Sequence, residues 1–234
     1  NVLGIGLVGD AFAAAQRTPN ILQNLFGEGA LSAAFIPEYS RLSDDDPRQA
    51  GRLAGGVASF LICLVVFLTA IGFLAAEPLT RAVAWGFSGE RFELTVRLVR
   101  VILLGTGVLV ISAWCLAVLN SHGRLFLSYA APIVWNLAQI AVLVSLAISE
   151  IRDSSSAEKL AWALVIGSVL QVLIQLPTVL RQNSHIRLNL HWRDKATAVV
   201  LKRFFPAVLG RGAVQLSSFI DLALASLLSL GATS

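Results

Sequence analysis

The fold is decided by the stretch Val101-Ile-Leu-Leu-Gly-Thr-Gly-Val-Leu-Val-Ile-Ser-Ala-Trp-Cys-Leu-Ala-Val-Leu-Asn-Ser121, which contains no Asp, Glu, Lys or Arg. A helix needs roughly 20 apolar residues to cross the hydrocarbon core of a bilayer. Three further uncharged runs meet this length, at residues 53–76, 125–149 and 160–180. The composition agrees, because 56% of the residues are hydrophobic and only 14% are charged. The sequence therefore predicts an all-α, polytopic transmembrane helix bundle.

Two other apolar segments are interrupted. Residues 204–230 contain Arg211 and Asp221, and residues 2–39 are broken by Pro19, Gly27, Gly29 and Pro37. Irregular backbone and charge at membrane depth are tolerated only where protein or water satisfies them. Both segments are therefore predicted to be spans that bend around a cavity.

The chain divides into three predicted regions. Residues 1–180 form a first six-helix transmembrane unit, residues 181–203 a basic cytoplasmic loop, and residues 204–234 a seventh transmembrane helix. The sequence contains no Met, and it stops after Ser234 without a polar tail. We therefore expect the start of the first helix to be missing and the chain to be truncated after the seventh.

The basic residues predict the orientation, because cytoplasmic loops are enriched in Lys and Arg. One set of alternate loops holds ten of the eighteen: Arg41, Arg48, Arg52, Arg124, Arg181, Arg187, Arg193, Lys195, Lys202 and Arg203. The other set holds six: Arg81, Arg91, Arg97, Arg100, Arg152 and Lys159. The larger set is assigned to the cytoplasm, which places a hairpin between the first two helices outside. The excess of positive charge suits anionic membrane lipids, and no nucleic-acid partner is expected.

Polar side chains within the apolar segments are the candidate functional residues. The stretch 20–37 places Gln23, Asn24 and Glu28 in an apolar run, and an ionisable residue at membrane depth usually marks a path or a site. Further Asn and Gln residues at this depth are Asn20, Asn136, Gln139, Gln171, Gln175 and Gln215. The structural alternative is hydrogen bonding between helices, worth about 0.6 kcal/mol on average.

Signals for other chemistry are weak. Cys63 and Cys115 lie within predicted spans, and the three histidines lack metal-ligand spacing. Gly4-Ile-Gly6-Leu-Val-Gly9 has the spacing of a dinucleotide-binding loop but lacks the strand that such a loop requires. Because no phosphate-binding loop or nucleophile elbow occurs either, we expect a protein that is not an enzyme and that uses no cofactor or metal.

Several motifs occur in order along the chain and resemble one family. They are Asp10-Ala-Phe, Arg17-Thr-Pro-Asn20, Asn24-Leu-Phe-Gly-Glu28-Gly-Ala-Leu-Ser, Asn120-Ser-x-Gly-Arg124, Ala131-Pro-Ile-Val-Trp-Asn136 and Gly212-Ala-Val-Gln-Leu-Ser-Ser-Phe-Ile-Asp221. Together they resemble the MurJ (MviN) family of bacterial lipid II flippases, within the multidrug/oligosaccharidyl-lipid/polysaccharide exporter superfamily. The resemblance implies the N-terminal half of a transporter with about fourteen helices.

The same resemblance implies a multi-pass protein of the bacterial cytoplasmic (inner) membrane. Its expected role in peptidoglycan biosynthesis is to flip lipid II, or a similar polyprenyl-pyrophosphate-linked glycan, by alternating access. Membrane lipids are the other expected partners. The alternatives are a polysaccharide-lipid flippase or a drug/cation antiporter of the same superfamily, or a membrane scaffold that does not transport.

The resemblance also implies a set of substrate-binding residues: Asp10, Arg17, Asn20, Gln23, Glu28 and Ser234. Asn20 and Glu28 match polar residues that line the family's central cavity, and Ser234 matches another cavity position. The family commonly has Arg where this chain has Gln23. Either Arg17 or Arg211 is then expected to supply the missing positive charge, or residues outside this chain hold the substrate phosphate.

Overall fold

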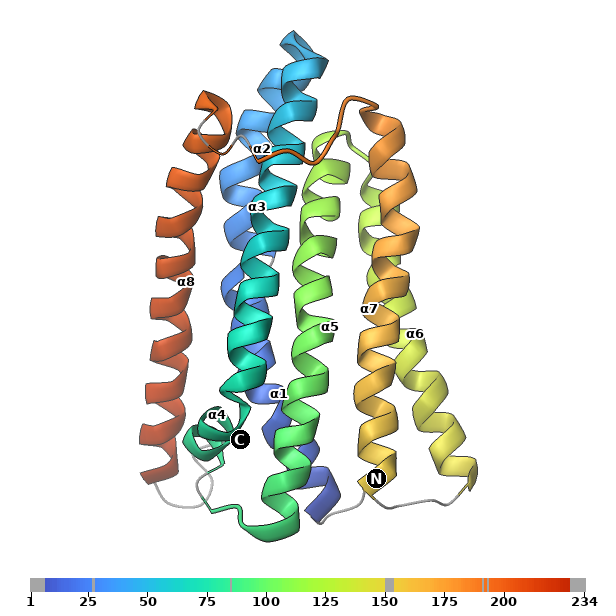
Figure 1. Ribbon diagram of the computed structural model, residues 1–234, viewed down its shortest axis with the longest axis vertical. Helices are drawn as coiled ribbons and strands as arrows, with labels where there is room; N and C mark the ends of the chain where they lie inside the picture. Colours follow the sequence, from blue (N-terminus) through green and yellow to red (C-terminus); the bar gives the residue numbers. More distant parts are fainter. Residues whose placement is uncertain are drawn as a thin grey trace.

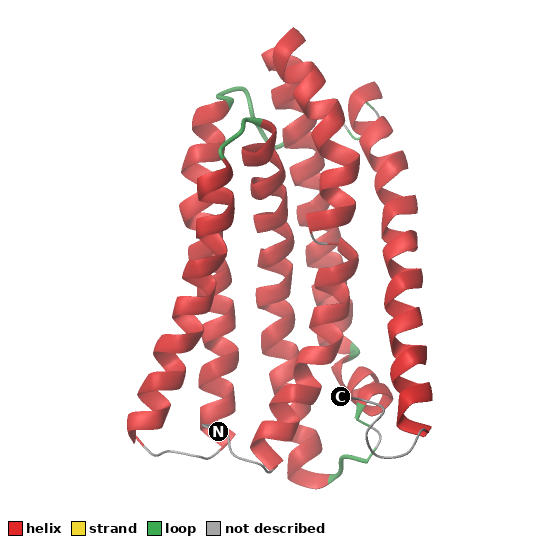
Figure 2. Cartoon of the chain, turned by 180° about the vertical axis from the view of Figure 1, so that it is seen from behind, coloured by secondary structure: helices red, strands yellow, loops and turns green. Residues whose placement is uncertain are grey.

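The computed structural model describes residues 7–26, 28–84, 86–149, 154–190, 192 and 194–227. These residues form helices and connecting loops, and no strand occurs among them (Figures 1 and 2). The helices, in chain order, are α1 Leu7–Phe26, α2 Glu28–Asp45, α3 Pro47–Leu74, α4 Ala76–Val83, α5 Gly89–Ser121, α6 Leu125–Ser149, α7 Ser154–Gln182 and α8 Lys195–Leu227.

Four of these helices, α3, α5, α6 and α7, are long and apolar enough to cross a membrane. They contain the runs 101–121, 125–149 and 160–180 in full and nearly all of 53–76, so the prediction of an all-α polytopic bundle is confirmed. α8 has the length of a span but carries Arg211 near its middle. Because α8 begins at Lys195, it includes the end of the predicted loop at residues 181–203.

The predicted hairpin between the first two helices does not form. α1 ends at Phe26 and α2 begins at Glu28, and the two helices follow one another from one end of the bundle to the other (Figure 1). Helix pairs that reverse direction usually need a connection of about 2–8 residues. The expected outer hairpin is therefore wrong, whereas the expected break in residues 2–39 lies between α1 and α2.

α5 is the central helix, and small residues allow its neighbours to approach closely. A Cβ atom added at Gly105 would lie 3.2 Å from the Cα atom of Val165 on α7. On the far side of α7, a Cβ atom added at Gly167 would lie 3.0 Å from the backbone oxygen of Trp135 on α6. Packing at small residues is a main source of stability between helices in lipid, where the hydrophobic effect does not bring helices together.

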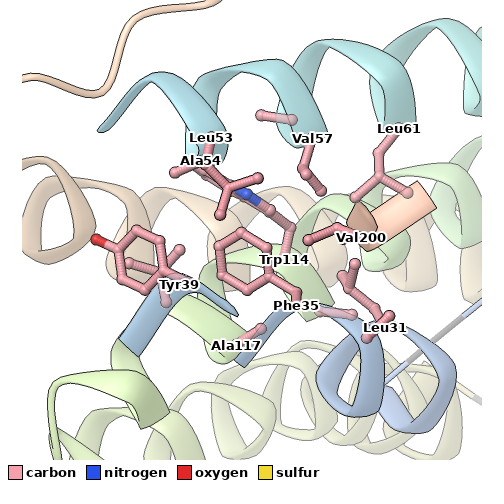
Figure 3. Packing of buried hydrophobic residues seen from close by; sticks show 14 of the residues in the cluster. Leu31, Phe35, Tyr39, Leu53, Ala54, Val57, Leu61, Trp114, Ala117 and Val200 are labelled. Atoms are coloured by element: carbon pink, nitrogen blue, oxygen red, sulfur yellow. The ribbon is translucent and has the colours of Figure 1, made fainter. Parts of the chain in front are cut away.

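Buried side chains form two clusters along this bundle. The first joins α2, α3, α5, α8 and the end of α7, and Figure 3 shows Phe35 and Tyr39 of α2 against α3 and against Trp114 of α5. The rings of Phe35 and Tyr39 stack with their centroids 4.9 Å apart. The second cluster joins α1, α4, α5 and α7, with Leu98 and Ile102 among its members. α5 belongs to both clusters and so fixes the other helices relative to one another.

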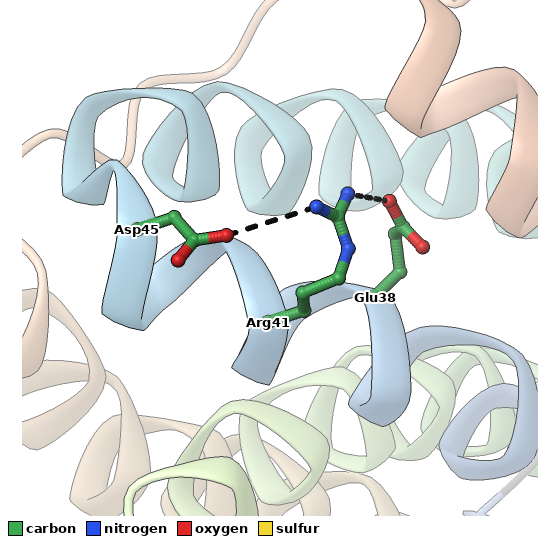
Figure 4. A network of polar contacts seen from close by, with 3 residues as sticks. All are labelled: Glu38, Arg41 and Asp45. Atoms are coloured by element: carbon green, nitrogen blue, oxygen red, sulfur yellow. Dashed lines mark hydrogen bonds and ion pairs between the residues drawn. The ribbon is translucent and has the colours of Figure 1, made fainter.

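The described members of the two predicted sets of basic residues lie at opposite ends of the bundle. One end carries the α2–α3 junction, the α5–α6 turn and the α7–α8 loop, and the other carries α4 and the start of α5 (Figure 1). At the more basic end, Arg41 of α2 pairs with Glu38 at 2.6 Å and with Asp45 at 3.8 Å (Figure 4). Next to this network, the Asp46 carboxylate caps α3 by accepting hydrogen bonds from the N–H groups of Arg48 and Gln49. This cap fixes the start of α3 at Pro47.

The loop between α7 and α8 is tied along α3. Asn183 Nδ2 donates to the carbonyl of Pro47 at 2.9 Å, and Asn189 Nδ2 donates to the carbonyl of Arg52 at 3.0 Å. The backbone of the loop runs against Gly51 and Gly55 of α3, where no side chain would fit. The small residues at positions 51 and 55 therefore allow the loop backbone to pack closely against α3.

We expect Gly55→Leu to detach this loop and to lower the free energy of unfolding by roughly 1–3 kcal/mol, the usual cost of overpacking. The reason is that any Cβ atom at Gly55 overlaps the carbonyl of Arg187, which is backbone and cannot move aside. Thermal unfolding of the full-length protein in detergent measures the change. Gly86→Ala is the control, because nothing lies within 4 Å of a Cβ atom there. Equal melting temperatures for the two variants would contradict the packing argument.

Candidate substrate cavity

A cavity of about 630 Å³ lies among α2, α5, α6, α7 and α8. Its walls mix apolar side chains with hydroxyl, amide and guanidinium groups. The polar residues that line it are Ser32, Ser112, Asn120, Ser128, Tyr129, Asn136, Gln171 and Arg211. Of the described residues that line this cavity, none is Asp or Glu, so the cavity suits an anion or a neutral polar group.

Arg211 is the one charged residue among the described residues of this lining. It lies near the middle of α8, and its guanidinium rests directly on Gly29 near the start of α2, where a Cβ atom would overlap it. None of the ion pairs among the described side chains involves Arg211. A cation at this depth is costly unless it faces a polar space or a partner. The cavity supplies that space.

The wall between α5 and α7 is held by a buried hydrogen-bond network. Gln171 Nε2 donates to Ser112 Oγ at 2.8 Å, and Ser112 Oγ donates to Gln175 Oε1 at 2.7 Å. Gln175 is fully buried, and its Nε2 atom has no hydrogen-bond partner among the described residues. Gln171 and Ser112 also line the cavity, so this network joins helix packing to the polar wall.

Removing the hub of this network with Ser112→Ala is expected to lower the free energy of unfolding by roughly 1–3 kcal/mol. The substitution leaves two buried amide groups without their partner, which is more costly than losing one exposed hydrogen bond. Thermal unfolding of the full-length protein measures the effect. Ser145→Ala is the matched control, because the Ser145 hydroxyl is exposed and bonds only to Val142 of its own helix. A Ser112→Ala variant as stable as this control would show that the amides find other partners.

α6 contributes a polar stripe to the cavity. Ser128, Pro132, Trp135 and Asn136 all line it and recur at helical spacing along one face. Two buried polar atoms of the lining, Trp135 Nε1 and Asn120 Oδ1, have no hydrogen-bond partner among the described residues. These two atoms belong to residues of the cavity lining, but both are buried within its wall.

A second cavity is unsuited to polar ligands. It has a volume of about 550 Å³, lies between α3 and α5, and is lined by apolar residues apart from Thr69. Val66, Phe73 and Ile111 are among these apolar side chains. The cavity that contains Arg211 is therefore the candidate functional site.

Two residues of the predicted binding set lie away from this cavity. Asp10 is an exposed residue of α1, and its carboxylate accepts a hydrogen bond from Arg91 of α5. The Arg91 guanidinium also lies 3.8 Å from the ring centroid of Phe87, so this ion pair fixes the less basic end of the bundle. Arg17 is exposed on α1 and is not among the residues that line the cavity.

The remaining members of the predicted set cannot be placed by their side chains. Asn20 and Gln23 belong to α1 and Glu28 is the first residue of α2, but their side chains lie outside the described part of the structure. Ser234 lies outside the described residues altogether. Gly29, which follows Glu28, does line the cavity.

The sequence alone identified Asn136, Gln171 and Arg211 as polar residues at membrane depth, and all three line the cavity. It missed the hydroxyl groups of Ser32, Ser112, Ser128 and Tyr129, because such residues are common in apolar helices. The one signal concerns Ser128, which shares a spacing of three and four residues along α6 with Pro132, Trp135 and Asn136. A polar stripe of that period could have been found before the structure was known.

A hydrogen bond at the more basic end links α2 to the α5–α6 turn. The Tyr39 hydroxyl lies 3.1 Å from His122 Nε2, and the two rings meet edge to face. Partial burial and the nearby Arg124 guanidinium lower the pKa of His122 from its ordinary value of 6.5. The neutral imidazole is therefore the form that fits the folded protein.

This shift predicts a pH dependence of stability. Between the ordinary pKa of His122 and its lower folded value, the unfolded protein binds more protons than the folded protein. The free energy of unfolding should therefore fall as the pH drops from about 7 toward 5. His122→Gln should remove part of this slope, whereas His185→Gln, in the exposed loop, should keep it. Melting temperatures measured across this range test the prediction, and identical slopes in all three proteins would contradict it.

The fold and the cavity together define a class. Four apolar helices long enough to span a membrane and a cavity with polar walls define a polytopic membrane protein. The family model described as "Lipid II flippase MurJ" matches residues 1–234. The chain therefore belongs to the lipid II flippase MurJ family of membrane proteins.

Individual relatives agree with this family. A protein of Bdellovibrio bacteriovorus named "Probable lipid II flippase MurJ" is 32% identical over 97% of this chain and 44% of its own length. "Lipid II flippase MurJ" of Burkholderia cenocepacia is 31% identical over 96% of the chain and 44% of its own length. The chain thus spans about half the length of the curated relatives that it matches.

Solved structures show the same fold. The inward closed conformation of a lipid II flippase MurJ superposes with a TM-score of 0.74 at 20% identity, over 95% of this chain and 45% of the other. A MATE protein crystallised with MaD3S superposes with a TM-score of 0.70 at 20% identity, over 91% of this chain and 48% of the other. At these identities the likeness concerns the fold alone.

Proposed function

We propose that this chain is part of a flippase that moves lipid II across the bacterial cytoplasmic membrane by alternating access. The observation that carries the proposal is the cavity with polar walls, with Arg211 as its one described charge. Family membership supports the same substrate.

The chemistry of the cavity fits the headgroup of such a lipid. Lipid II joins a polyprenyl tail to a pyrophosphate, a disaccharide and a peptide, so its headgroup offers negative charge, hydroxyl groups and amides. A guanidinium can donate two parallel hydrogen bonds to phosphate oxygens. The amides of Asn136 and Gln171 and the hydroxyl groups of the wall can both donate to and accept from sugars and peptides.

Arg211 is proposed as the cation that binds the pyrophosphate. The family commonly has Arg at the position of Gln23, and the two candidates for a replacement within this chain were Arg17 and Arg211. Arg211 lines the cavity, whereas Arg17 does not. Asn20, Gln23, Glu28 and Ser234 stay proposed members of the binding set, and Glu28 is supported by the position of its neighbour Gly29. The ion pair with Arg91 supports a structural role for Asp10 instead.

The alternatives differ in what they require of the cavity. A drug/cation antiporter needs negative charge to attract its substrate, yet the described lining contains one arginine and no carboxylate. A polysaccharide-lipid flippase moves a substrate with the same pyrophosphate, so the geometry suits it equally. A scaffold that only packs helices has no use for a cation that faces a polar cavity. Membership of the MurJ family favours lipid II over the polysaccharide lipid as the proposed substrate.

The orientation is part of the proposal. The end of the bundle with the α7–α8 loop carries Arg41, Arg124, Arg181 and the other described residues of the larger basic set, so we assign that end to the cytoplasm. The proposed membrane is the bacterial cytoplasmic membrane, where lipid II is made on the inner face.

The direct test is complementation. Bacterial cells depleted of their own lipid II flippase should grow when they express the full-length protein, and lipid II should become accessible on the outer face of the membrane. The matched control is a strain that lacks an O-antigen flippase. Rescue of that strain alone would overturn the proposal in favour of a polysaccharide lipid, and rescue of neither strain by a well-expressed protein would favour the scaffold.

A further inference from the structure

A separate basic cavity of about 580 Å³ lies between the start of α6 and the end of α7. It shares no lining residue with the central cavity: the described residues that line it are Arg124, Phe126, Leu127, Thr178, Arg181 and Gln182. Neither arginine takes part in an ion pair within the described part of the chain. The described lining contains no carboxylate either. Two positive charges therefore face the same cavity without a negative partner among the described residues.

Both arginines are held on rigid elements. Gly123 adopts a left-handed conformation with φ +66°, and the N–H of Arg124 donates to the carbonyl of Leu119 at 2.9 Å. This turn fixes the backbone of Arg124 immediately before α6. Arg181 lies in the last turn of α7, which packs along α6. The backbone of both arginines is thus held by the α5–α6 turn and the α6–α7 helix pair.

The surroundings of this cavity are those of a membrane interface. The start of α6 and the end of α7, whose residues line it, lie at the more basic end of the bundle (Figure 1). The side chains beside it are apolar and strongly exposed, with Phe126 86% exposed, Tyr129 72% and Leu125 51%. Exposed apolar residues continue along α6 through Ile133 and Leu137. The positively charged cavity therefore lies at the N-terminal end of the exposed apolar surface of α6.

We propose that this cavity binds the phosphate headgroup of an anionic phospholipid, with the acyl chains along the exposed face of α6. Arg124 and Arg181 would donate to the phosphate oxygens, and the Thr178 hydroxyl and the Gln182 amide add two neutral donors. Basic pockets between transmembrane helices are known to bind such headgroups on the cytoplasmic side. An amphipathic ligand explains both the paired cations and the apolar rim, whereas a soluble anion explains only the cations. The site is independent of the proposed transport of lipid II.

The test uses the purified full-length protein in detergent, titrated with dioleoyl phosphatidylglycerol and separately with dioleoyl phosphatidylcholine. Native mass spectrometry counts the bound lipid. Arg124→Gln and Arg181→Gln should each weaken binding of phosphatidylglycerol about fivefold, and the double variant about thirtyfold. Arg187→Gln is the matched control, because Arg187 is exposed in the neighbouring loop and does not line the cavity. Arg124→Lys with Arg181→Lys should keep most of the affinity, because the charges remain.

Three results would overturn the proposal. The first is a double Gln variant that binds phosphatidylglycerol as tightly as the Arg187→Gln control. The second is equal binding of phosphatidylcholine, which would show that the headgroup charge is not recognised. The third is displacement of the lipid by inorganic phosphate at equal concentration, which would assign the site to a soluble anion. Size-exclusion profiles and melting temperatures that match the wild type establish that each variant is folded.

Discussion

Arg211→Gln is expected to lower lipid II transport by the full-length protein roughly 10- to 150-fold, with little loss of membrane insertion or stability. The substitution keeps a polar side chain, although a shorter one, and removes the charge that the described lining of the cavity would present to the pyrophosphate. Hydrogen bonds to charged groups contribute about 1.5–3 kcal/mol, which gives this range. Transport is measured as lipid II that reaches the outer face, at matched membrane abundance of each variant.

Two further variants make this result specific. Arg203→Gln removes an exposed arginine near the start of α8 that does not line the cavity, and it should transport normally. Arg17→Gln tests which of the two arginines binds the pyrophosphate. If Arg211 has this role, lipid II transport should fall much less in Arg17→Gln than in Arg211→Gln. The assignment of the pyrophosphate to Arg211 would be wrong if Arg17→Gln alone were inactive.

The second large effect is expected at Gly29, which has no functional group of its own. A Cβ atom there would overlap the guanidinium of Arg211, so Gly29→Ala forces that group to move. The end of an arginine side chain moves easily, so stability should change little. The guanidinium then leaves the position from which it donates to phosphate. Losing one of two charge-assisted hydrogen bonds predicts transport that is roughly tenfold lower.

A double-mutant cycle tests whether Gly29 acts through Arg211. Transport by the Gly29→Ala, Arg211→Gln double variant should equal that of Arg211→Gln alone, because residues in contact do not contribute additively. Gly210→Ala is the matched control, since it adds the same methyl group beside Arg211 in a position with nothing within 4 Å. Additive losses at Gly29 and Arg211 would show that Gly29 matters for another reason, such as the path of α2.

The sequence by itself determined the membrane-spanning helices. Runs without charge at residues 53–76, 101–121, 125–149 and 160–180 predicted α3, α5, α6 and α7, because the thickness of the bilayer sets both the length and the composition of a span. It also determined the family, through motifs that occur in order along the chain. The break between α1 and α2 followed from the glycine and proline residues of the segment 2–39.

Only the tertiary structure decided which polar residues share one cavity. Asn136 and Gln171 line it, whereas Gln175 is buried against Ser112, and nothing in their identity distinguishes these amides. The direction in which each points depends on how α5, α6 and α7 are rotated about their axes, which packing at Gly105 and Gly167 fixes. The path of α1 and α2 was likewise decided by the tertiary structure. The broken apolar run at residues 2–39 is compatible with a hairpin or with one bent span.

The contrast between Asp10 and Arg211 has the same physical origin. Each is a charged residue in an apolar segment, and the sequence marks both as costly to place in lipid. Asp10 is compensated by Arg91, which is 81 residues away in the chain, and Arg211 by a polar cavity built from five helices. Local sequence reveals that a charge needs compensation. Which group compensates the charge depends on contacts between residues far apart in the chain. These contacts form only when the helices pack.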